Sequence, residues 1–246
     1  MSTPTSGRIA FGPAGRAPIA VALDAPDLAT AGQWAAAVSP SVAALKVGLE
    51  SYLRDGAGGV GAVLAAAEDA ATEPPALFLD LKLHDIPNTV AGAARSVAPL
   101  APAILTVHAL GGPQMIAAAA QQLPQTRIAA VTILTSMDEA ALAATGIAGT
   151  PIQAVLRLAR MAVEAGARAL VCSPLEVAGV RAAVGADVLL ITPGVRPTTA
   201  GLGDQRRVAT PAAALASGAD LLVIGRPITG AADPGVAAAQ IAAEIH

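Results

Sequence analysis

Short apolar runs alternate with longer alanine-rich segments along most of the 246-residue chain. The apolar runs predict eight β-strands, at residues 19–24, 43–47, 77–82, 104–108, 128–134, 169–172, 188–192 and 221–225. The segments between them predict helices at residues 28–38, 60–71, 90–98, 113–122, 151–165, 175–184, 211–217 and 234–245. Eight alternating strand–helix units in a chain of this length predict a single-domain (β/α)8 TIM barrel. A doubly wound open sheet is the alternative, because periodicity alone does not show closure.

Composition and charge narrow the class of protein. The sequence is 54% hydrophobic but only 2% aromatic, and much of its apolar content is alanine, a strong helix former. The net charge of −3 disfavours a nucleic-acid-binding surface, and Gly, Pro or polar residues interrupt the apolar runs, which disfavours a membrane span. Residues 1–17 lack the apolar core of a signal peptide and are predicted to form a flexible N-terminal tail before a catalytic barrel domain at residues 18–246. These features favour a cytoplasmic protein.

Polar residues follow the carboxyl ends of most predicted strands. They are Asp24, Lys46, Asp80, Lys82, His108, Thr135, Ser136 and Arg196. In a barrel of parallel strands these ends meet at one mouth, where active sites are built. The pattern therefore predicts an active site at the C-terminal mouth.

The stretch LFLDLKLHDIPNT, residues 77–89, carries the densest group of candidate catalytic residues. Asp80 and Lys82 are two residues apart in a predicted strand, so their side chains are expected on the same face. Asp85 follows where the chain leaves the sheet, and Pro87 suits a first helical position. At ~4 Å and an effective dielectric of ~20, each opposite-charge pair contributes roughly 4 kcal/mol before desolvation, so neighbouring carboxylates would keep Lys82 protonated. A solvated ion cluster at a strand end is the alternative interpretation.

Two glycine–arginine turns near the end of the sequence are candidates for phosphate binding. Gly194 and Arg196 follow the seventh predicted strand, and Gly225 and Arg226 follow the eighth, where barrels of this kind often bind phosphate. Glycine lets backbone N–H groups approach an anion, and arginine offers a bidentate fork. Two ordinary turns with surface arginines are the alternative. The sequence has no G-x-G-x-x-G or Walker motif that would indicate a dinucleotide or ATP.

The sequence gives no strong indication of a metal site or of a nucleophile. His84, His108 and His246 lack ligand-type spacing, so His84 is expected to be a turn residue and His108 a residue lining the mouth. Ser136 lacks a G-x-S-x-G elbow. The single cysteine, Cys172, lies in an apolar run and is expected to be an inert core residue.

These motifs together resemble the orotidine 5′-phosphate decarboxylase family, and its compact bacterial branch most closely, over residues 18–240. The resemblance rests on VALD (21–24), LKVG (45–48), DLKLHDIPNT (80–89), VHALGG (107–112), VTILTSM (131–137), VCSP (171–174), TPGVRP (192–197), GDQRR (203–207) and VIGRPIT (223–229). Leu49 and Leu110 depart from the charged and small polar residues that are usual there, but neither is a predicted site residue.

The resemblance implies a reaction, the decarboxylation of orotidine 5′-phosphate to uridine 5′-phosphate in pyrimidine synthesis, without metal or organic cofactor. It implies that Lys82 donates the proton and that Asp80 lies against the substrate carboxylate. The implied substrate-binding residues are Asp24 and Lys46 for the ribose, Thr135, Ser136 and Pro193 for the pyrimidine, and Arg196, Gln205, Gly225 and Arg226 for the phosphate. Lys46 would also join the charge network. The implied assembly is a homodimer in which Asp85 and Thr89 reach the neighbouring subunit's site.

Two other functions fit parts of the pattern. Metal-dependent sugar-phosphate decarboxylases or aldolases share the barrel and a D-x-K-x-x-D strand, but they place an acidic metal ligand where this chain has Lys46, whose charge would repel a divalent cation. A non-catalytic barrel that binds a phosphorylated ligand would not need Lys82 beside carboxylates. A decarboxylation assay in the presence of a chelator separates the three functions.

Overall fold

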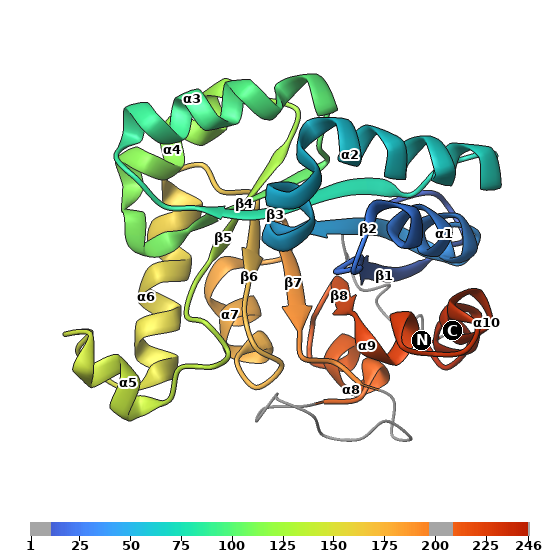
Figure 1. The fold of residues 1–246 in the computed structure, drawn as a ribbon. Coiled ribbons are helices and arrows are strands. Elements are labelled where there is room, and N and C mark those ends of the chain that lie inside the picture. The colour runs from blue at the N-terminus through green and yellow to red at the C-terminus, as the bar shows by residue number, and fades with distance from the viewer. Residues whose placement is uncertain (1–10, 197–208, 246) are drawn as a thin grey trace.

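Eight parallel strands form a closed barrel in which β8 pairs with β1 (Figure 1). The strands are β1 (Ala17–Ala22), β2 (Val42–Gly48), β3 (Ala76–Leu83), β4 (Ile104–His108), β5 (Arg127–Val131), β6 (Ala169–Val171), β7 (Leu189–Pro193) and β8 (Leu221–Ile224). The computed structural model describes residues 11–196 and 209–245. The predicted (β/α)8 barrel is confirmed, and pairing between β1 and β8 rules out the open sheet.

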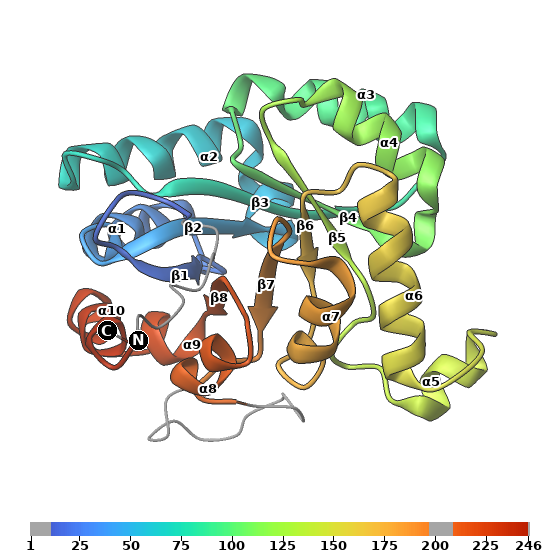
Figure 2. The ribbon, with the colours of Figure 1, turned by 180° about the vertical axis from the view of Figure 1, so that it is seen from behind.

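Helices surround the barrel, as two opposite views show (Figures 1 and 2). They are α1 (Leu28–Val38), α2 (Leu49–Ala70), α3 (Pro87–Val97), α4 (Pro113–Gln122), α5 (Glu139–Ala144), α6 (Pro151–Glu164), α7 (Val177–Val184), α8 (Pro211–Ala216), α9 (Arg226–Thr229) and α10 (Pro234–Ala243), with 3-10 turns η1 (Ala98–Leu100) and η2 (Ala109–Gly111). Local chemistry fixes several starts, because Asp27, Asp138 and Asp233 each accept a hydrogen bond from a first-turn N–H. Thr150 and Gln153 form a capping box at the start of α6.

Every predicted strand has a counterpart, and α1, β4 and α4 have the predicted bounds. Three differences have local causes. The helix α2 begins at Leu49, whereas the sequence predicts a start at residue 60. The first part was missed because Gly56, with a φ of 64°, kinks the helix within a glycine-rich segment that hides the helical period. The strand β5 ends at Val131, so residues 132–134 belong to the following loop. The helices α5 and α9 were missed because they are only six and four residues long.

The interior of the barrel is filled by five alanines, four isoleucine or leucine side chains and one phenylalanine ring. The cluster consists of Ala20, Ala43, Ala44, Phe78, Ile104, Ala129, Ala169, Leu189, Ile191 and Leu221. Alanines contributed by four strands leave the space that Phe78 occupies. A second and larger apolar cluster packs the strands against the helices.

Toward the C-terminal mouth, the side chains of the barrel divide into two halves. The charged half comprises Asp24, Lys46, Asp80, Lys82 and Thr106, which lie on or just after β1 to β4. The apolar half comprises Val131, Val171, Ile191 and Val223, which lie on β5 to β8. The four charged side chains of the first group and the four apolar side chains of the second therefore share one mouth but come from different halves of the chain.

Residues 11–16 lie against the other end of the barrel. Phe11 packs against the interior cluster, and the guanidinium of Arg127 lies over its ring, 5.5 Å from the centroid. Gly12 has a φ of 84°, and a Cβ there would lie 2.6 Å from the Cβ of Ala43. Part of the segment expected to form a tail (1–17) is thus packed, and β1 already begins at Ala17; residues 1–10 lie outside the described residues.

A buried ion pair at this same end joins α7 to β7 and β8. Asp220, whose side chain is fully buried, pairs with Arg181 and accepts a hydrogen bond from the N–H of Leu190 at 2.7 Å. Arg181 also donates to the carbonyl oxygens of Val188 at 2.9 Å and Gly218 at 3.0 Å. The pair therefore holds the starts of two strands and lies away from the mouth.

Candidate active site

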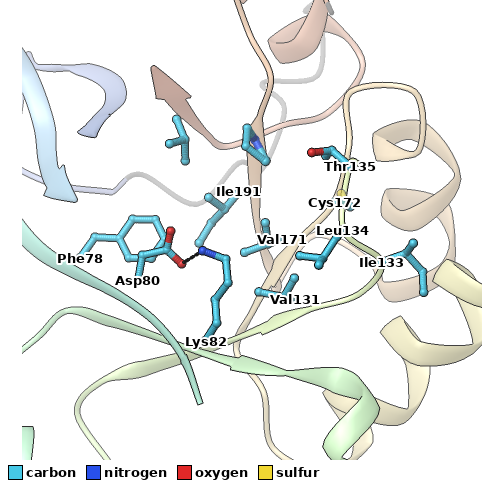
Figure 3. Close-up of a pocket in the computed structure, with 12 residues that line it drawn as sticks. Phe78, Asp80, Lys82, Val131, Ile133, Leu134, Thr135, Val171, Cys172 and Ile191 are labelled. Atoms are coloured by element: carbon cyan, nitrogen blue, oxygen red, sulfur yellow. Dashed lines mark ion pairs between the residues drawn. The ribbon is translucent and has the colours of Figure 1, made fainter. Parts of the chain in front are cut away.

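Four charged side chains of the charged half meet at the C-terminal mouth. The Nζ of Lys46 lies 3.3 Å from Oδ2 of Asp80 and 3.6 Å from Oδ1 of Asp24. The Nζ of Lys82 lies 2.8 Å from Oδ1 of Asp80 (Figure 3). Asp80 therefore bridges two lysines, and the charges alternate in sign from Asp24 to Lys82.

The end of β3 is irregular, and this irregularity sets the position of Lys82. Leu79 pairs with Leu105, but the next pair joins Leu83 to Val107, so β3 advances four residues while β4 advances two. Within this stretch Lys82 has a φ of 47°, in the left-handed region that residues with side chains rarely adopt. Such a conformation costs about 1–3 kcal/mol and is typical of functional sites.

Thr106, which the sequence analysis did not single out, ties this irregular stretch together. It is fully buried in β4. Its hydroxyl donates a hydrogen bond to Oδ1 of Asp80 at 3.0 Å and accepts one from the backbone N–H of Lys82 at 2.9 Å. The sequence signal was a polar residue inside the apolar run ILTVH.

Asp80 is held in its anionic form. Burial alone would raise its pKa, but the charges of Lys46 and Lys82, with hydrogen bonds from Lys82 and Thr106, hold the pKa of Asp80 below its usual value. Its side chain is only 13% exposed, so without these partners the charge would be costly. The mouth therefore presents a carboxylate between two ammonium groups at neutral pH.

An apolar hollow of about 200 Å³ lies beside Lys82. Phe78 and the four residues of the apolar half line it, and Thr135 lies across it from Asp80 (Figure 3). Apolar walls lower the local dielectric, which strengthens the interaction of Lys82 with any negative charge that develops nearby. The hollow therefore suits an apolar group of a small ligand placed beside the lysine.

A more polar hollow of about 310 Å³ adjoins the first one. Asp80, Pro193 and Val223 line both hollows, so the two form one continuous site. Asp24 and Lys46 line the polar hollow. Together the hollows reach the volume of roughly 300–1,000 Å³ that is usual for small-molecule sites.

The predicted phosphate-binding residues lie in this polar hollow. Gly194 and Arg196 come from the segment after β7, and Gly225 and Arg226 from the segment after β8. Gly194 has a φ of 81°. Arg196 is only 9% exposed, and its backbone N–H donates a hydrogen bond to the carbonyl of Ala209 at 3.0 Å. The structure thus brings two arginines from distant segments to one hollow. The predicted Gln205 lies outside the described residues.

Two predicted pyrimidine-binding residues follow β5. Because β5 ends at Val131, Thr135 and Ser136 belong to the loop rather than to the strand end. Thr135 is half-buried and lines the apolar hollow, whereas Ser136 is exposed.

Asp85 and Thr89 lie apart from the network. Both are exposed, and Oδ1 of Asp85 accepts a hydrogen bond from the N–H of Ile86 at 2.6 Å. Within the described part of one chain, the carboxylate that pairs with Lys82 is that of Asp80 and not that of Asp85. The expected carboxylates on both sides of Lys82 are therefore not assembled by a single chain.

The two histidines of this region lie next to each other beside the mouth. The ring centroids of His84 and His108 are 5.3 Å apart, with the planes tilted by 36°. Burial, assisted by the charges of His84 and Lys82, lowers the pKa of His108. His108 is therefore neutral at pH 7 and adds no third positive charge to the network.

Residues 11–196 and 209–245 contain neither a candidate metal centre nor a candidate membrane span. No group of three or more His, Cys, Asp or Glu side chains in these ranges could hold a metal ion. None of the helices described is long and apolar enough to cross a membrane. Cys172 is buried and lines the apolar hollow, and burial raises the pKa of its thiol far above the ordinary range, which agrees with the predicted inert role.

The closed barrel and the lysine–aspartate network at its C-terminal mouth define a class, the (β/α)8-barrel enzymes that bind a small ligand at this mouth. The family model "Orotidine 5'-phosphate decarboxylase / HUMPS family" matches residues 17–241. The chain belongs to this family.

Individual relatives agree with this assignment. The chain is 70% identical over 230 residues to an orotidine 5′-phosphate decarboxylase of Thermobifida fusca, covering 94% of this chain and 96% of the relative. It is 61% identical over 242 residues to the enzyme of the same name from Frankia casuarinae, covering 94% and 88%. Its structure is similar to the crystal structure of orotidine 5′-phosphate decarboxylase from Lactobacillus acidophilus, with a TM-score of 0.78, 36% identity and coverage of 94% and 99%.

Proposed function

We propose that this chain converts orotidine 5′-phosphate to uridine 5′-phosphate and CO₂, in pyrimidine nucleotide synthesis. The observation that carries the proposal is the Lys46–Asp80–Lys82 network, which lies where an apolar hollow meets a polar, arginine-lined one. A relative that is 70% identical over almost the whole chain and bears the decarboxylase name supports the same reaction.

The substrate is proposed to span both hollows. Its phosphate would lie in the polar hollow, held by Arg196, Gln205, Gly225 and Arg226. Its ribose hydroxyls would meet Asp24 and Lys46, which line the same hollow. Its pyrimidine would enter the apolar hollow, with Thr135, Ser136 and Pro193 nearby, so that C6 and its carboxylate face Lys82 and Asp80. The binding energy of the remote phosphate would then be available to drive the carboxylate toward Asp80.

The chemistry follows from the charges around C6. The bond between C6 and the carboxylate breaks, CO₂ leaves, and the electron pair stays on C6, where the pyrimidine offers no obvious electron sink. The protonated Nζ of Lys82, fixed 2.8 Å from Asp80, would stabilise this pair as it forms and then donate its proton to C6. Lys82 would be left neutral and would regain a proton from solvent. Asp80, held anionic, would repel the substrate carboxylate before it leaves.

Metal-dependent sugar-phosphate chemistry is the second candidate, because such enzymes resemble this chain in the barrel and in the D-x-K-x-x-D strand. The position of Lys46 argues against it. Its ammonium group lies between Asp24 and Asp80, 3.6 and 3.3 Å from their oxygens, and it would repel a divalent cation that these carboxylates could otherwise bind. The proposed reaction therefore involves no metal ion, and the family resemblance implies no organic cofactor.

The active enzyme is proposed to be a homodimer in which Asp85 and Thr89 of one chain complete the site of the other. Both side chains are exposed, and Asp85 does not pair with Lys82 of its own chain. Exposed apolar side chains gather in the segments after β2, β3 and β4, which are neighbours in the barrel. They are Leu49, Leu53, Ile86 and Leu110, and they are 45%, 79%, 65% and 44% exposed. Exposed large apolar side chains on three neighbouring segments favour a protein–protein contact on this side of the mouth. A cytoplasmic location remains part of the proposal.

A direct assay tests the function. Purified protein is incubated with orotidine 5′-phosphate and a chelator, and uridine 5′-phosphate is quantified. Conversion that persists with the chelator and disappears in Lys82→Ala is the expected result. Turnover that requires an added divalent cation would favour the metal-dependent alternative, and binding without conversion would favour a non-catalytic barrel.

A further inference from the structure

We propose that Thr106 is a positioning residue for the decarboxylation, acting through Lys82 and Asp80 without touching the substrate. The inference rests on the proposed function and adds a residue to it. Its basis is a closed ring of interactions that ties both ends of Lys82 to one carboxylate.

The ring has three contacts and starts at the backbone of Lys82, and a fourth contact joins it to Lys46. The N–H of Lys82 donates to Oγ1 of Thr106 at 2.9 Å, and the Thr106 hydroxyl donates to Oδ1 of Asp80 at 3.0 Å. The same Oδ1 lies 2.8 Å from the Nζ of Lys82, while Oδ2 faces Lys46 at 3.3 Å. Thr106 therefore fixes both the orientation of the Asp80 carboxylate and the position of the Lys82 backbone from which the ammonium group extends.

The hydroxyl group is necessary to this ring because it both donates and accepts. Its one proton goes to Asp80, and a lone pair receives the N–H of Lys82. Lys82 lies in the irregular end of β3 with a positive φ, so its backbone has no regular strand geometry to hold it. An apolar side chain of the same shape would leave a partly buried N–H without this partner and would free the carboxylate to turn.

Other buried threonines of the barrel behave differently. The hydroxyl of Thr126 donates to the carbonyl of Pro102 at 2.7 Å, and that of Thr132 donates to the carbonyl of Val171 at 3.0 Å. Those bonds connect backbone segments and involve no ionised group. Thr126 precedes β5 at the end of the barrel away from the mouth, so it provides a matched control for the loss of one buried hydroxyl.

The test compares Thr106→Val, Thr106→Ser and Thr126→Val with wild type. The single-turnover rate of decarboxylation, the Kd for uridine 5′-phosphate and the Tm are measured for each protein. Thr106→Val is expected to slow the chemical step by about tenfold or more, since hydrogen bonds to charged groups are the stronger kind. Its Kd for uridine 5′-phosphate should change less than about threefold, because the phosphate and ribose contacts lie elsewhere. Thr106→Ser should restore most of the rate, and Thr126→Val should lower the Tm while leaving the rate unchanged.

Several outcomes would overturn the inference. They are a Thr106→Val rate within about twofold of wild type, a Thr106→Ser rate as low as that of Thr106→Val, or a loss of nucleotide affinity as large as the loss of rate. If Thr106→Val does not fold, Thr106→Ala is judged by the same criteria. A wild-type protein without turnover would instead overturn the proposed function, and this inference with it.

Discussion

Replacing Lys82 tests the chemical assignment and the backbone strain in one set of proteins. In Lys82→Ala the 2.8 Å contact with Asp80 is lost, a Coulomb term of about 6 kcal/mol before desolvation at an effective dielectric of ~20. Transition-state stabilisation by one fixed charge typically contributes about 10²–10³ in rate, and proton donation about 10²–10⁴. We expect kcat to fall by at least about 10⁴, because both contributions disappear together. Lys82→Arg should fail as well, since a guanidinium barely gives up its proton.

The same position makes a stability prediction that does not depend on chemistry. Lys82 has a φ of 47°, which glycine adopts without strain and alanine does not. Lys82→Gly should therefore unfold with a free energy about 0.5–1 kcal/mol higher than Lys82→Ala, although both are inactive. Ala101→Gly is the matched control, because Ala101 has a φ of 46° away from the network.

Turnover is followed by the formation of uridine 5′-phosphate, and stability by urea denaturation, with circular dichroism to confirm folding. A Lys82→Ala protein that retains more than about one per cent of kcat would refute Lys82 as the proton donor, because that loss is smaller than proton donation and a fixed charge together supply. A Lys82→Gly protein that is no more stable than Lys82→Ala would refute the strain argument alone, provided that Ala101→Gly shows the expected gain.

Three further predictions concern the phosphate, the dimer and the fold. Arg226→Ala should weaken binding of the nucleotide by about 1.5–3 kcal/mol more than binding of the phosphate-free nucleoside, measured by titration calorimetry; equal losses would make Arg226 structural. When inactive Lys82→Ala and Asp85→Ala proteins exchange subunits, roughly a quarter of wild-type activity should return, because about half the dimers are mixed and each has one intact site. No recovery after verified exchange would remove Asp85 from the partner's site. Asp220→Ala should lower the free energy of unfolding by about 3 kcal/mol, since it leaves the charge of Arg181 unpaired, while kcat stays unchanged. A loss of kcat in folded Asp220→Ala protein would contradict the purely structural role.

Most of the fold could be predicted because its signals are local. Apolar runs located every strand, and caps or prolines marked many helix starts, so α1, β4 and α4 were predicted with their exact bounds. The start of α2 was missed because Gly56 interrupts the pattern that reveals a helix. Closure of the barrel depends on pairing between β1 and β8, the two strands farthest apart in the chain, and no local pattern encodes that contact.

Some residues of the candidate site could likewise be predicted from local sequence, and others could not. Asp24, Lys46, Asp80 and Lys82 could be predicted because each comes at a strand end, which the topology brings to one mouth. Thr106 could not, because its role depends on the irregular pairing of β3 with β4 rather than on its own neighbours in sequence. The positive φ of Lys82 was hidden for the same reason.

The division of the mouth into a charged half and an apolar half has a consequence for redesign. The ionised groups of the network all come from β1 to β3 and the loop after β1, whereas the wall that faces them is built from Val131, Val171, Ile191 and Val223 on β5 to β8. Substitutions among these four side chains would reshape the space offered to a substituted ring without altering any charge or its partners. Libraries confined to the second half of the gene would therefore vary the shape of the pocket. The reactive groups, which the first half encodes, would stay unchanged.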